Sequence, residues 1–249
     1  MDRAGFSLRL RTELEAQLTL GHPIFAELFS SERNWTLLKL LTLEGYQITR
    51  YFLDYIEHLH RRCPIPRHKR RLHLNLLEEQ TGSFSRTKNH VVLMQDFIRA
   101  QRISDEERDS YQPSAETREL IEYRMHAVTG ENTYHIGAAA VMIASEGQSL
   151  ETRGGASRAK LLNELYGLSE QDTLFFSVHQ KEDIGHVREG IELVADLCDT
   201  EQMQTEALTA VKHTCRLFWN MYASVAQKYW LMKLPEPDQR ITQARALAQ

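Results

Sequence analysis

Apolar residues recur three and four positions apart along most of the chain, and this spacing limits most strongly what it can fold into. Regular alternation of apolar and polar residues, which half-buried strands show, is scarce. Only 12 Gly and 6 Pro interrupt the 249 residues. The pattern therefore predicts an all-α fold, a single-domain bundle of about seven main helices.

Breaks between the apolar stretches define the expected helices. The longer ones are predicted over about 33–62, 131–150, 169–196 and 200–231, and shorter ones over 5–18, 23–30, 68–80, 86–101, 114–128 and 156–166. Gly82, among small polar residues, separates 68–80 from 86–101. No linker, repeat or low-complexity tract divides residues 1–249, so one domain is expected. Residues 234–249, with two prolines, are expected to form a loosely attached tail.

Composition excludes several classes of protein. The net charge of -4 argues against a nucleic-acid partner. No apolar run approaches the ~20 residues that span a bilayer, so no membrane partner is expected. Cys63, Cys198 and Cys215 are far apart and indicate free thiols in a reducing, cytoplasmic environment. Nucleotide binding has no support, because the chain has neither a GxGxxG sequence nor a P-loop.

The stretch "FFSVHQKEDIGHVREG" carries His179, Asp183 and His186, at positions i, i+4 and i+7 of an expected helix. Such residues share one narrow stripe of the helix surface. The helix also carries several apolar residues, so it is at least partly buried and its polar groups need partners. One metal cation satisfies all three groups, and two imidazoles with a carboxylate suit iron, manganese, cobalt or zinc. A buried polar cluster without metal is equally compatible with the triplet alone.

Further candidate ligands stand on other expected helices. Glu78 and Glu79 close one helix, His90 lies near the start of the next, and Glu146 follows the apolar stretch "GAAAVMIA". Each glutamate taken alone is better interpreted as a helix-end residue. Taken together with His179, Asp183 and His186, the set contains three carboxylates and three imidazoles. Their charge of about -3 nearly balances the +4 of two divalent irons, which matters in a dry core.

The order of these residues resembles that of the haem-oxygenase-like di-iron oxidases, which share a seven-helix fold with thiaminase-II-type proteins and pyrroloquinoline-quinone synthase. "GHPIFAELFSSERNWTLLKLLTLEGYQITRYF" looks like the opening of that family. "NLLEEQTG" followed by His90 looks like its Asn-Leu-x-(Asp/Glu)-Glu-x-Gly…His element. "EGQ", "LYGL" and "FFSVHQKEDIGH" look like its Glu, Tyr-Gly and His-x3-Asp-x2-His. The spacing from Asn75 to Glu79 points to Glu79, rather than Glu78, as the ligand.

The resemblance implies two Fe(II) ions, O2 as co-substrate and six metal ligands: Glu79, His90, Glu146, His179, Asp183 and His186. One iron would take Glu79, His90 and Asp183, and the other Glu146, His179 and His186, with the bridging ligands left open. In this family the helix with the equivalents of Glu79 and His90 can be mobile, and the break at Gly82–Ser83 fits such mobility.

The implied activity is an O2-dependent oxidation of a small carboxylate-bearing substrate. An amino acid or derivative is favoured, with carbon–carbon or carbon–nitrogen cleavage, desaturation or nitrile formation as the reaction. Polar residues near the expected metal-site helices favour an amino-acid-like substrate, although each taken alone is better interpreted as a surface or structural residue: Arg50, Tyr51, Tyr134, His135 and Lys181. The resemblance also allows a homodimer.

Four alternatives stay open. The protein could be a fatty-acid oxidative decarboxylase or an N-oxygenase of the same family. It could be a cofactor-free thiaminase-like enzyme, although none of the three cysteines stands where the resemblance would place a nucleophile. It could be a non-enzymatic helical protein with buried polar pairs. It could bind haem through His22, although the Gly-His-Pro turn indicates a structural role for that histidine.

Overall fold

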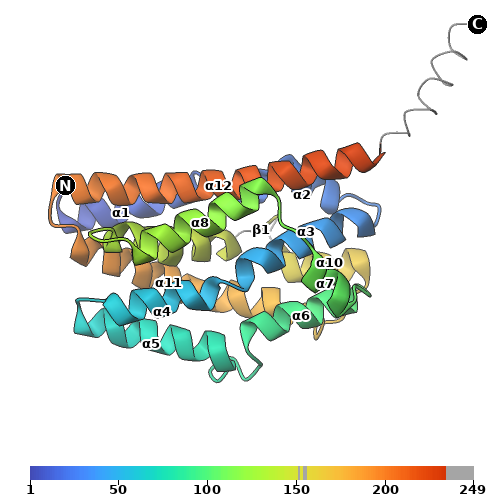
Figure 1. Ribbon diagram of the computed structural model, residues 1–249, viewed down its shortest axis with the longest axis horizontal. Helices are drawn as coiled ribbons and strands as arrows, with labels where there is room; N and C mark the ends of the chain where they lie inside the picture. Colours follow the sequence, from blue (N-terminus) through green and yellow to red (C-terminus); the bar gives the residue numbers. More distant parts are fainter. Residues whose placement is uncertain (151, 154–155, 234–249) are drawn as a thin grey trace, which may run out of the picture.

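Helices lying along the long axis of the molecule make up almost all of the structure, a computed structural model that describes residues 1–150, 152–153 and 156–233 (Figure 1). The elements, in chain order, are α1 (Arg3–Glu15), η1 (Thr19–Gly21), α2 (Pro23–Leu28), α3 (Trp35–Thr49), α4 (Phe52–Arg62), α5 (Pro66–Thr81), α6 (His90–Ala100), α7 (Asp105–Ser110), α8 (Ala115–Thr129), α9 (Tyr134–Ala138), η2 (Ala139–Ser145), η3 (Glu146–Leu150), β1 (Thr152–Arg153), β2 (Ala156–Ser157), α10 (Arg158–Tyr166), α11 (Leu174–Leu197) and α12 (Glu201–Lys233). The predicted all-α class is confirmed. Strands β1 and β2 form a two-residue antiparallel ribbon, too short for its sequence to show.

More helical pieces are present than the seven predicted, because some expected helices are broken. The helix expected over 33–62 is in fact α3 and α4, separated at Arg50 and Tyr51. Thr49 Oγ1 donates a hydrogen bond of 2.9 Å to Gly45 O at the end of α3. Such a bond from a side chain to the preceding turn competes with the helix ladder and is often found where helices bend.

The segment expected as one helix over 131–150 changes its hydrogen bonding twice. It starts as α9, widens into the π-helix η2 and tightens into the 3-10 helix η3 at Glu146. The residues of η2 are all buried. Gly190 of α11 lies against this segment so closely that a Cβ atom there would stand 2.5 Å from Met142 O. Turns of π-helix are frequent at functional sites, and this one ends directly before a candidate ligand.

A non-helical segment separates α5 from α6 and places their ends face to face. Gly82 ends α5 in the left-handed conformation (φ 63°), which glycine adopts without strain. The Asn89 side chain accepts the N–H of Val92 and begins α6 at His90, four residues later than the expected position 86. Glu79 therefore stands in the last turn of α5 and His90 at the first position of α6.

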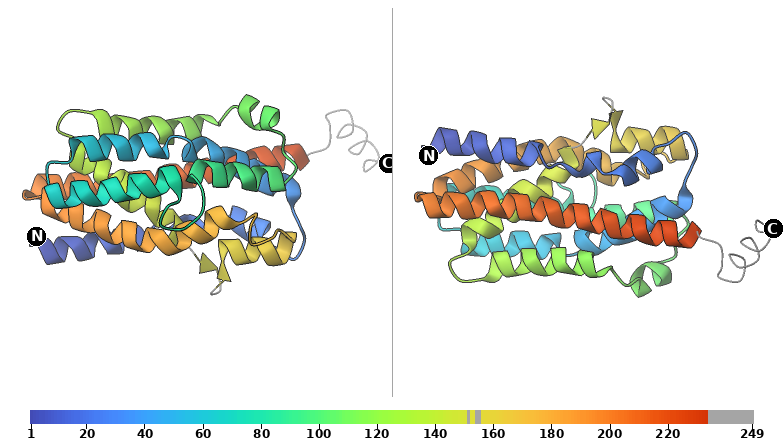
Figure 2. Two further views of the ribbon diagram at one scale, coloured as in Figure 1. Left: turned by 90° about the horizontal axis from the view of Figure 1, so that it is seen from below. Right: turned by 90° about the horizontal axis from the view of Figure 1, so that it is seen from above.

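Two clusters of buried apolar side chains form the core, and α11 runs from one to the other. Near its start, Phe175 and Phe176 pack on the cluster built from α2, α3, α6, α10 and the second half of α12. Further along, Val187 and Ile191 belong to the cluster built from α1, α4, α5, η2 and the first half of α12. Figure 2 shows α12 running the length of the bundle between α1 and α8. The polar stripe of α11 thus lies between the two apolar clusters.

Within the described ranges, none of the helices is both long enough and apolar enough to cross a bilayer.

Candidate metal centre

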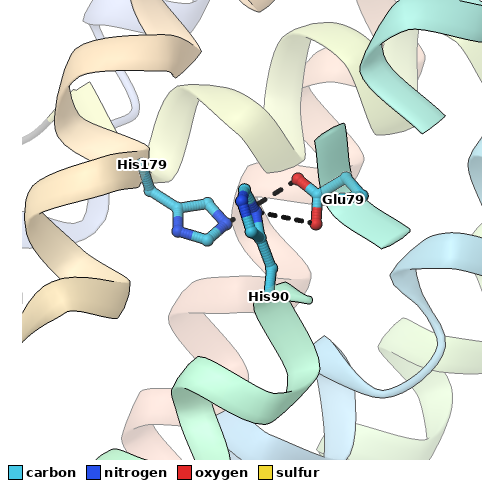
Figure 3. A group of neighbouring side chains, drawn as sticks. All are labelled: Glu79, His90 and His179. Atoms are coloured by element: carbon cyan, nitrogen blue, oxygen red, sulfur yellow. Dashed lines mark ion pairs between the residues drawn. The ribbon is translucent and has the colours of Figure 1, made fainter. Parts of the chain in front are cut away.

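Three side chains from three helices meet in the first of two polar groups. His90 Nδ1 lies 3.0 Å from Glu79 Oε2, and His179 Nε2 lies 3.8 Å from Glu79 Oε1. The ring centres of His90 and His179 are 4.7 Å apart, and the two rings meet edge to face. Figure 3 shows Glu79 of α5, His90 of α6 and His179 of α11 converging. Their ligand atoms are close enough to share one ion.

The second group lies one turn further along α11. His186 Nδ1 is 3.3 Å from Asp183 Oδ1 and 3.3 Å from Glu146 Oε1. The side-chain amide of Asn75 donates a hydrogen bond of 3.1 Å to Glu146 Oε1. Glu146, Asp183 and His186 again offer ligand atoms close enough to share one ion.

The structure brings all six residues named from the sequence into these two groups, but divides them differently from the resemblance. His179 stands with Glu79 and His90, and Asp183 stands with Glu146 and His186. His179 and Asp183 lie on the same face of α11 but at heights that differ by about one helical turn. His179 is therefore level with the start of α6, and Asp183 is level with η3. That these residues bind metal stays a prediction.

Buried atoms without hydrogen bonds test whether a cation fits here. Among the described residues, these ligand atoms are buried and have no hydrogen-bond partner: Glu79 Oε1, His90 Nδ1 and Nε2, Asp183 Oδ1 and Oδ2, and His186 Nδ1. The short contacts among them are ion-pair contacts without the alignment of hydrogen bonds. An unsatisfied buried polar group costs about 1–3 kcal/mol, so a protein rarely keeps several together. Imidazole nitrogens and carboxylate oxygens in this number fit divalent iron, which would satisfy them.

The electrostatics of the second group show how strongly its members interact. Burial lowers the pKa of His186, but the Glu146 carboxylate and then Asp183 outweigh it and raise the pKa to about 11. Burial, followed by repulsion from Glu146, raises the pKa of Asp183. Burial alone would also raise the pKa of Glu146, but attraction to His186 lowers it. One added positive charge thus already stabilises this pair of carboxylates.

The pKa values of the two histidines in the first group are shifted in opposite directions. Burial lowers the pKa of His90, but the Glu79 carboxylate outweighs it and the pKa is raised. For His179 burial prevails and lowers the pKa. His179 Nδ1 lies 2.6 Å from Phe175 O, and since a carbonyl only accepts, Nδ1 carries the proton. The lone pair of Nε2 then faces Glu79 and is available to a metal.

Two further carboxylates lie next to His90. Glu78 Oε1 is 3.5 Å from His90 Nε2, but Glu78 also accepts the backbone N–H groups of Phe84 (2.5 Å) and Ser85 (3.2 Å). Glu78 thereby ties the segment after Gly82 to α5. Glu182, which the sequence reasoning missed, groups with Glu78 and His90. Its spacing of three from His179 is the signal that could have revealed it.

A cavity of about 160 Å³ adjoins both groups and is lined in part by Glu79, Glu146, His179 and Asp183. Most of the other lining side chains are apolar, and Arg124 and Arg158 also contribute to the wall.

The five polar residues noted near the expected metal-site helices are not part of the wall of this cavity. The residues that line this cavity do not include Arg50, Tyr51, Tyr134, His135 or Lys181. His135 instead contacts Glu206 at 2.8 Å, and Tyr134 OH donates to Leu59 O at 2.9 Å. Thr49 and Phe52, which flank Arg50 and Tyr51, do line the cavity, because neighbouring residues on a helix point in different directions.

His22 and the three cysteines belong to neither of the two groups. His22 caps α2, its Nδ1 accepting the N–H of Ile24 at 3.2 Å. Cys63, Cys198 and Cys215 are buried, and burial raises the pKa of Cys198 to about 12, which makes it a poor nucleophile.

An all-α bundle with histidines and carboxylates gathered between its helices defines the class of protein. Solved structures share the fold. One is a domain of unknown function with a heme oxygenase-like fold from Shewanella denitrificans, with a TM-score of 0.72 and 17% identity; the match covers 96% of this chain and 97% of that one. A TenA homolog from Pseudomonas syringae is also similar (TM-score 0.71, 15% identity, 91% and 96%). The fold is therefore haem-oxygenase-like.

Residues 40–219 match the model of a family described as iron-containing redox enzymes, and the chain belongs to this family. Its curated relatives include a protein named 4-aminobenzoate synthase from Chlamydia muridarum, 26% identical over 171 residues, which are 68% of this chain and 69% of that one. A protein of the same name from Nitrosomonas europaea is 28% identical over 156 residues, 62% of this chain and 60% of that one.

Proposed function

We propose that the protein is an O2-dependent non-haem di-iron oxidoreductase acting on a small organic carboxylate, with amino acids and their derivatives as first substrates to test. The observation that carries the proposal is the pair of ligand groups, which adjoin one cavity and in which Glu79, His90, Asp183 and His186 have buried atoms without hydrogen-bond partners among the described residues. Membership of an iron-containing redox family supports it.

In this proposal each group holds one ion. Glu79, His90 and His179 would hold the first, and Glu146, Asp183 and His186 the second. Bound ferrous iron supplies the electrons that activate O2. The three carboxylates offset most of the charge of two divalent ions, so the centre is stable in a dry surrounding.

The chain's own residues position the ligands and keep water away. Asn75 holds Glu146 by its hydrogen bond, and Phe175 O fixes the protonated nitrogen of His179. Residues that hold a ligand in this way typically tune metal affinity 10- to 100-fold. The apolar wall of the cavity excludes water from the reacting bond.

Formation of an aminobenzoate is a second, more specific candidate. It is favoured by the names of the curated relatives, which are 4-aminobenzoate synthases. A benzoate-type molecule is also a small carboxylate, so both candidate functions require the cavity to hold a small molecule with one carboxylate group.

We place the protein in the cytoplasm, in keeping with its three buried cysteines, as a homodimer that takes a small molecule rather than nucleic acid or membrane as partner. Light scattering at several protein concentrations tests the dimer.

The deciding experiment loads the purified chain with Fe(II) without O2, counts the bound iron and then admits O2. Two irons per chain are expected, with O2 uptake accelerated by one class among amino acids, aromatic acids and fatty acids. Well under one iron per chain would refute the di-iron centre and leave a non-enzymatic or cofactor-free role. Acceleration by fatty acids alone would point to the decarboxylase alternative instead.

A further inference from the structure

Arg124 of α8 is a buried cation beside the candidate metal centre. Only 1% of its surface is exposed, and it lines the same cavity as Glu79 and Glu146. Its Nη1 donates a long hydrogen bond of 3.4 Å to Ser145 Oγ, and its Nε donates one of 3.3 Å to Leu120 O. Ser145 directly precedes Glu146, and both line this cavity together with Arg124 and Asp183.

The charge of Arg124 has no counter-ion among the described residues. No carboxylate there forms an ion pair with it, and Nη2 is buried without a hydrogen-bond partner. Arg108, by comparison, pairs with Asp105 at 2.5 Å and with Asp109 at 2.8 Å. A guanidinium stays charged in proteins, and a buried charge without a partner is costly. A buried cation of this kind on the wall of a cavity favours the binding of an anion from outside the protein.

Two aromatic rings hold the guanidinium in this position. Its central carbon lies 4.7 Å from the centre of the Tyr55 ring and 5.5 Å from that of Phe218. Contacts of this kind stabilise a cation without neutralising it. The donor groups are therefore preorganised, and binding an anion needs little ordering of the side chain.

The cavity next to Arg124 is compact and mostly apolar. Its volume is about 160 Å³, whereas a cavity of roughly 150 Å³ lined by apolar side chains holds one benzene molecule. Aromatic side chains form much of its wall: Phe25, Phe29, Phe97, Phe175, Phe176 and Phe218. An anionic ligand that fills it thus has an apolar body about as large as one ring.

We propose that Arg124 binds the carboxylate of the substrate, and that the substrate is a compact carboxylic acid with one aromatic ring or a short branched chain as its apolar body. A carboxylate accepts hydrogen bonds from two nitrogens of one guanidinium, which fixes its orientation as well as its position. Arg124 is then a substrate-binding residue next to the centre. Naming the ligand as substrate rests on the proposed function, but the anion site itself does not.

The test compares benzoate with benzamide, a neutral molecule of the same shape, by calorimetric titration of the full chain loaded with Fe(II) in the absence of O2. Wild-type protein is expected to bind benzoate at least about 10-fold more tightly, as charge-assisted hydrogen bonds require. Arg124→Met, which keeps the apolar stem, should weaken benzoate binding by about 10- to 100-fold and leave benzamide within about twofold. Equal binding of the two molecules to the wild type would overturn the proposal.

Two variants control for the position of the charge. Arg118→Met removes an exposed arginine from the same helix and should change neither affinity. Arg158→Met removes the second arginine of the cavity wall. Loss of the preference for benzoate in Arg158→Met, with the preference intact in Arg124→Met, would overturn the assignment. Tighter binding of dodecanoate than of benzoate would overturn the proposal that the substrate has a compact apolar body.

A further titration separates this proposal from the proposed function. The preference for benzoate should persist in metal-free protein, because Arg124 rather than iron holds the anion. Its disappearance without iron would overturn the proposal, whereas its persistence supports the site even if iron counting fails.

Folding of the variant is checked by its melting temperature without ligand. Arg124→Met should melt no lower than the wild type, because it removes a buried charge without counter-ion. If it does not fold, Arg124→Lys keeps the charge and loses the paired donors. It should keep a reduced preference for benzoate, and an undiminished preference would overturn the paired contact.

Discussion

The side-chain amide of Asn75 lies 3.1 Å from Glu146 Oε1 and donates a hydrogen bond to it. Asn75 belongs to α5, the helix that also carries Glu79, and it is buried. The bond therefore connects the helix of one ligand group to a carboxylate of the other. The same oxygen lies 3.3 Å from His186 Nδ1, so the bond helps to hold Glu146 beside His186.

Replacing Asn75 by Ala should weaken metal binding at Glu146, Asp183 and His186 by about 10- to 100-fold, the usual cost of losing a residue that orients a ligand. Binding at Glu79, His90 and His179 should change much less. Competition with a metal chelator measures both affinities. Asn163→Ala, which removes an amide from α10 outside the cavity wall, serves as the control. Equal weakening of both sites would contradict the orienting role.

The division of the six residues into two groups is tested by two single variants. His179→Ala should remove about one of two bound metals, the one shared with Glu79 and His90. His186→Ala should remove the other, so the double variant binds almost none. Metal analysis after gel filtration gives the stoichiometry. His60→Ala, on α4, should keep both metals. Unchanged binding in either site variant would contradict the assignment.

The sequence allowed the helices and the ligand types to be predicted because both follow local patterns. Apolar spacing predicted α11 and α12 closely, and the His-x3-Asp-x2-His spacing identified one stripe of α11. It did not predict the break at Arg50 or the π-helix, because neither depends on composition alone. The break accompanies a bond from Thr49 to its own helix, and the π-helix packs directly against Gly190.

The chemistry of the cavity could be predicted less well. Arg124 reads in sequence as one more cation on an amphipathic helix, yet it is buried. Its neighbours Tyr55 and Phe218 come from α4 and α12, far away along the chain. The five polar residues noted from the sequence do not line the cavity. Which residues line a cavity depends on helix rotation and packing, which short motifs do not specify.

An acid-sensitive contact holds three helices together at Asp196 of α11. Its carboxylate accepts hydrogen bonds of 2.7 Å from Arg3 of α1 and from His68 of α5, and a further one from Arg67. Burial alone would raise the pKa of Asp196, but these donors, Arg3 first, hold it well below its usual range. A lowered pKa means that the stabilisation is complete above the unfolded value of about 3.9 and is lost as the pH falls below it toward the folded value.

Asp196→Asn should therefore lower the free energy of unfolding at pH 7 by about 1–3 kcal/mol, the contribution of hydrogen bonds to a charged group. The difference from wild type should shrink as the pH falls below about 4, because the carboxylate then takes up a proton in the unfolded wild-type chain but not yet in the folded one. Urea unfolding at several pH values measures it. The exposed Asp199→Asn is the control. A difference that stays constant with pH would show that charge is not the cause.

Two glycines of α11 provide a matched test of how the helix is positioned. A Cβ atom on Gly190 would lie 2.5 Å from the backbone oxygen of Met142 in η2, whereas one on Gly185 would have nothing within 4 Å. Gly190→Ala must push α11 away from η2, at a cost of about 1–3 kcal/mol or more. Gly185→Ala should instead stabilise the helix by about 0.5–1 kcal/mol, because alanine loses less backbone entropy.

The Gly190 variant should lose metal affinity and the Gly185 variant should not. Position along the chain alone would suggest the opposite, because Gly185 lies between the candidate ligands Asp183 and His186. Displacing α11 from η2 moves Asp183 and His186 away from Glu146, so Gly190→Ala should bind metal at this group at least about 10-fold more weakly. Gly185→Ala should keep wild-type affinity, since its methyl group points into open space. Thermal melting and chelator competition on both variants decide the matter. Weaker binding in Gly185→Ala than in Gly190→Ala would mean that the packing of α11 on η2 does not set the spacing of the ligands.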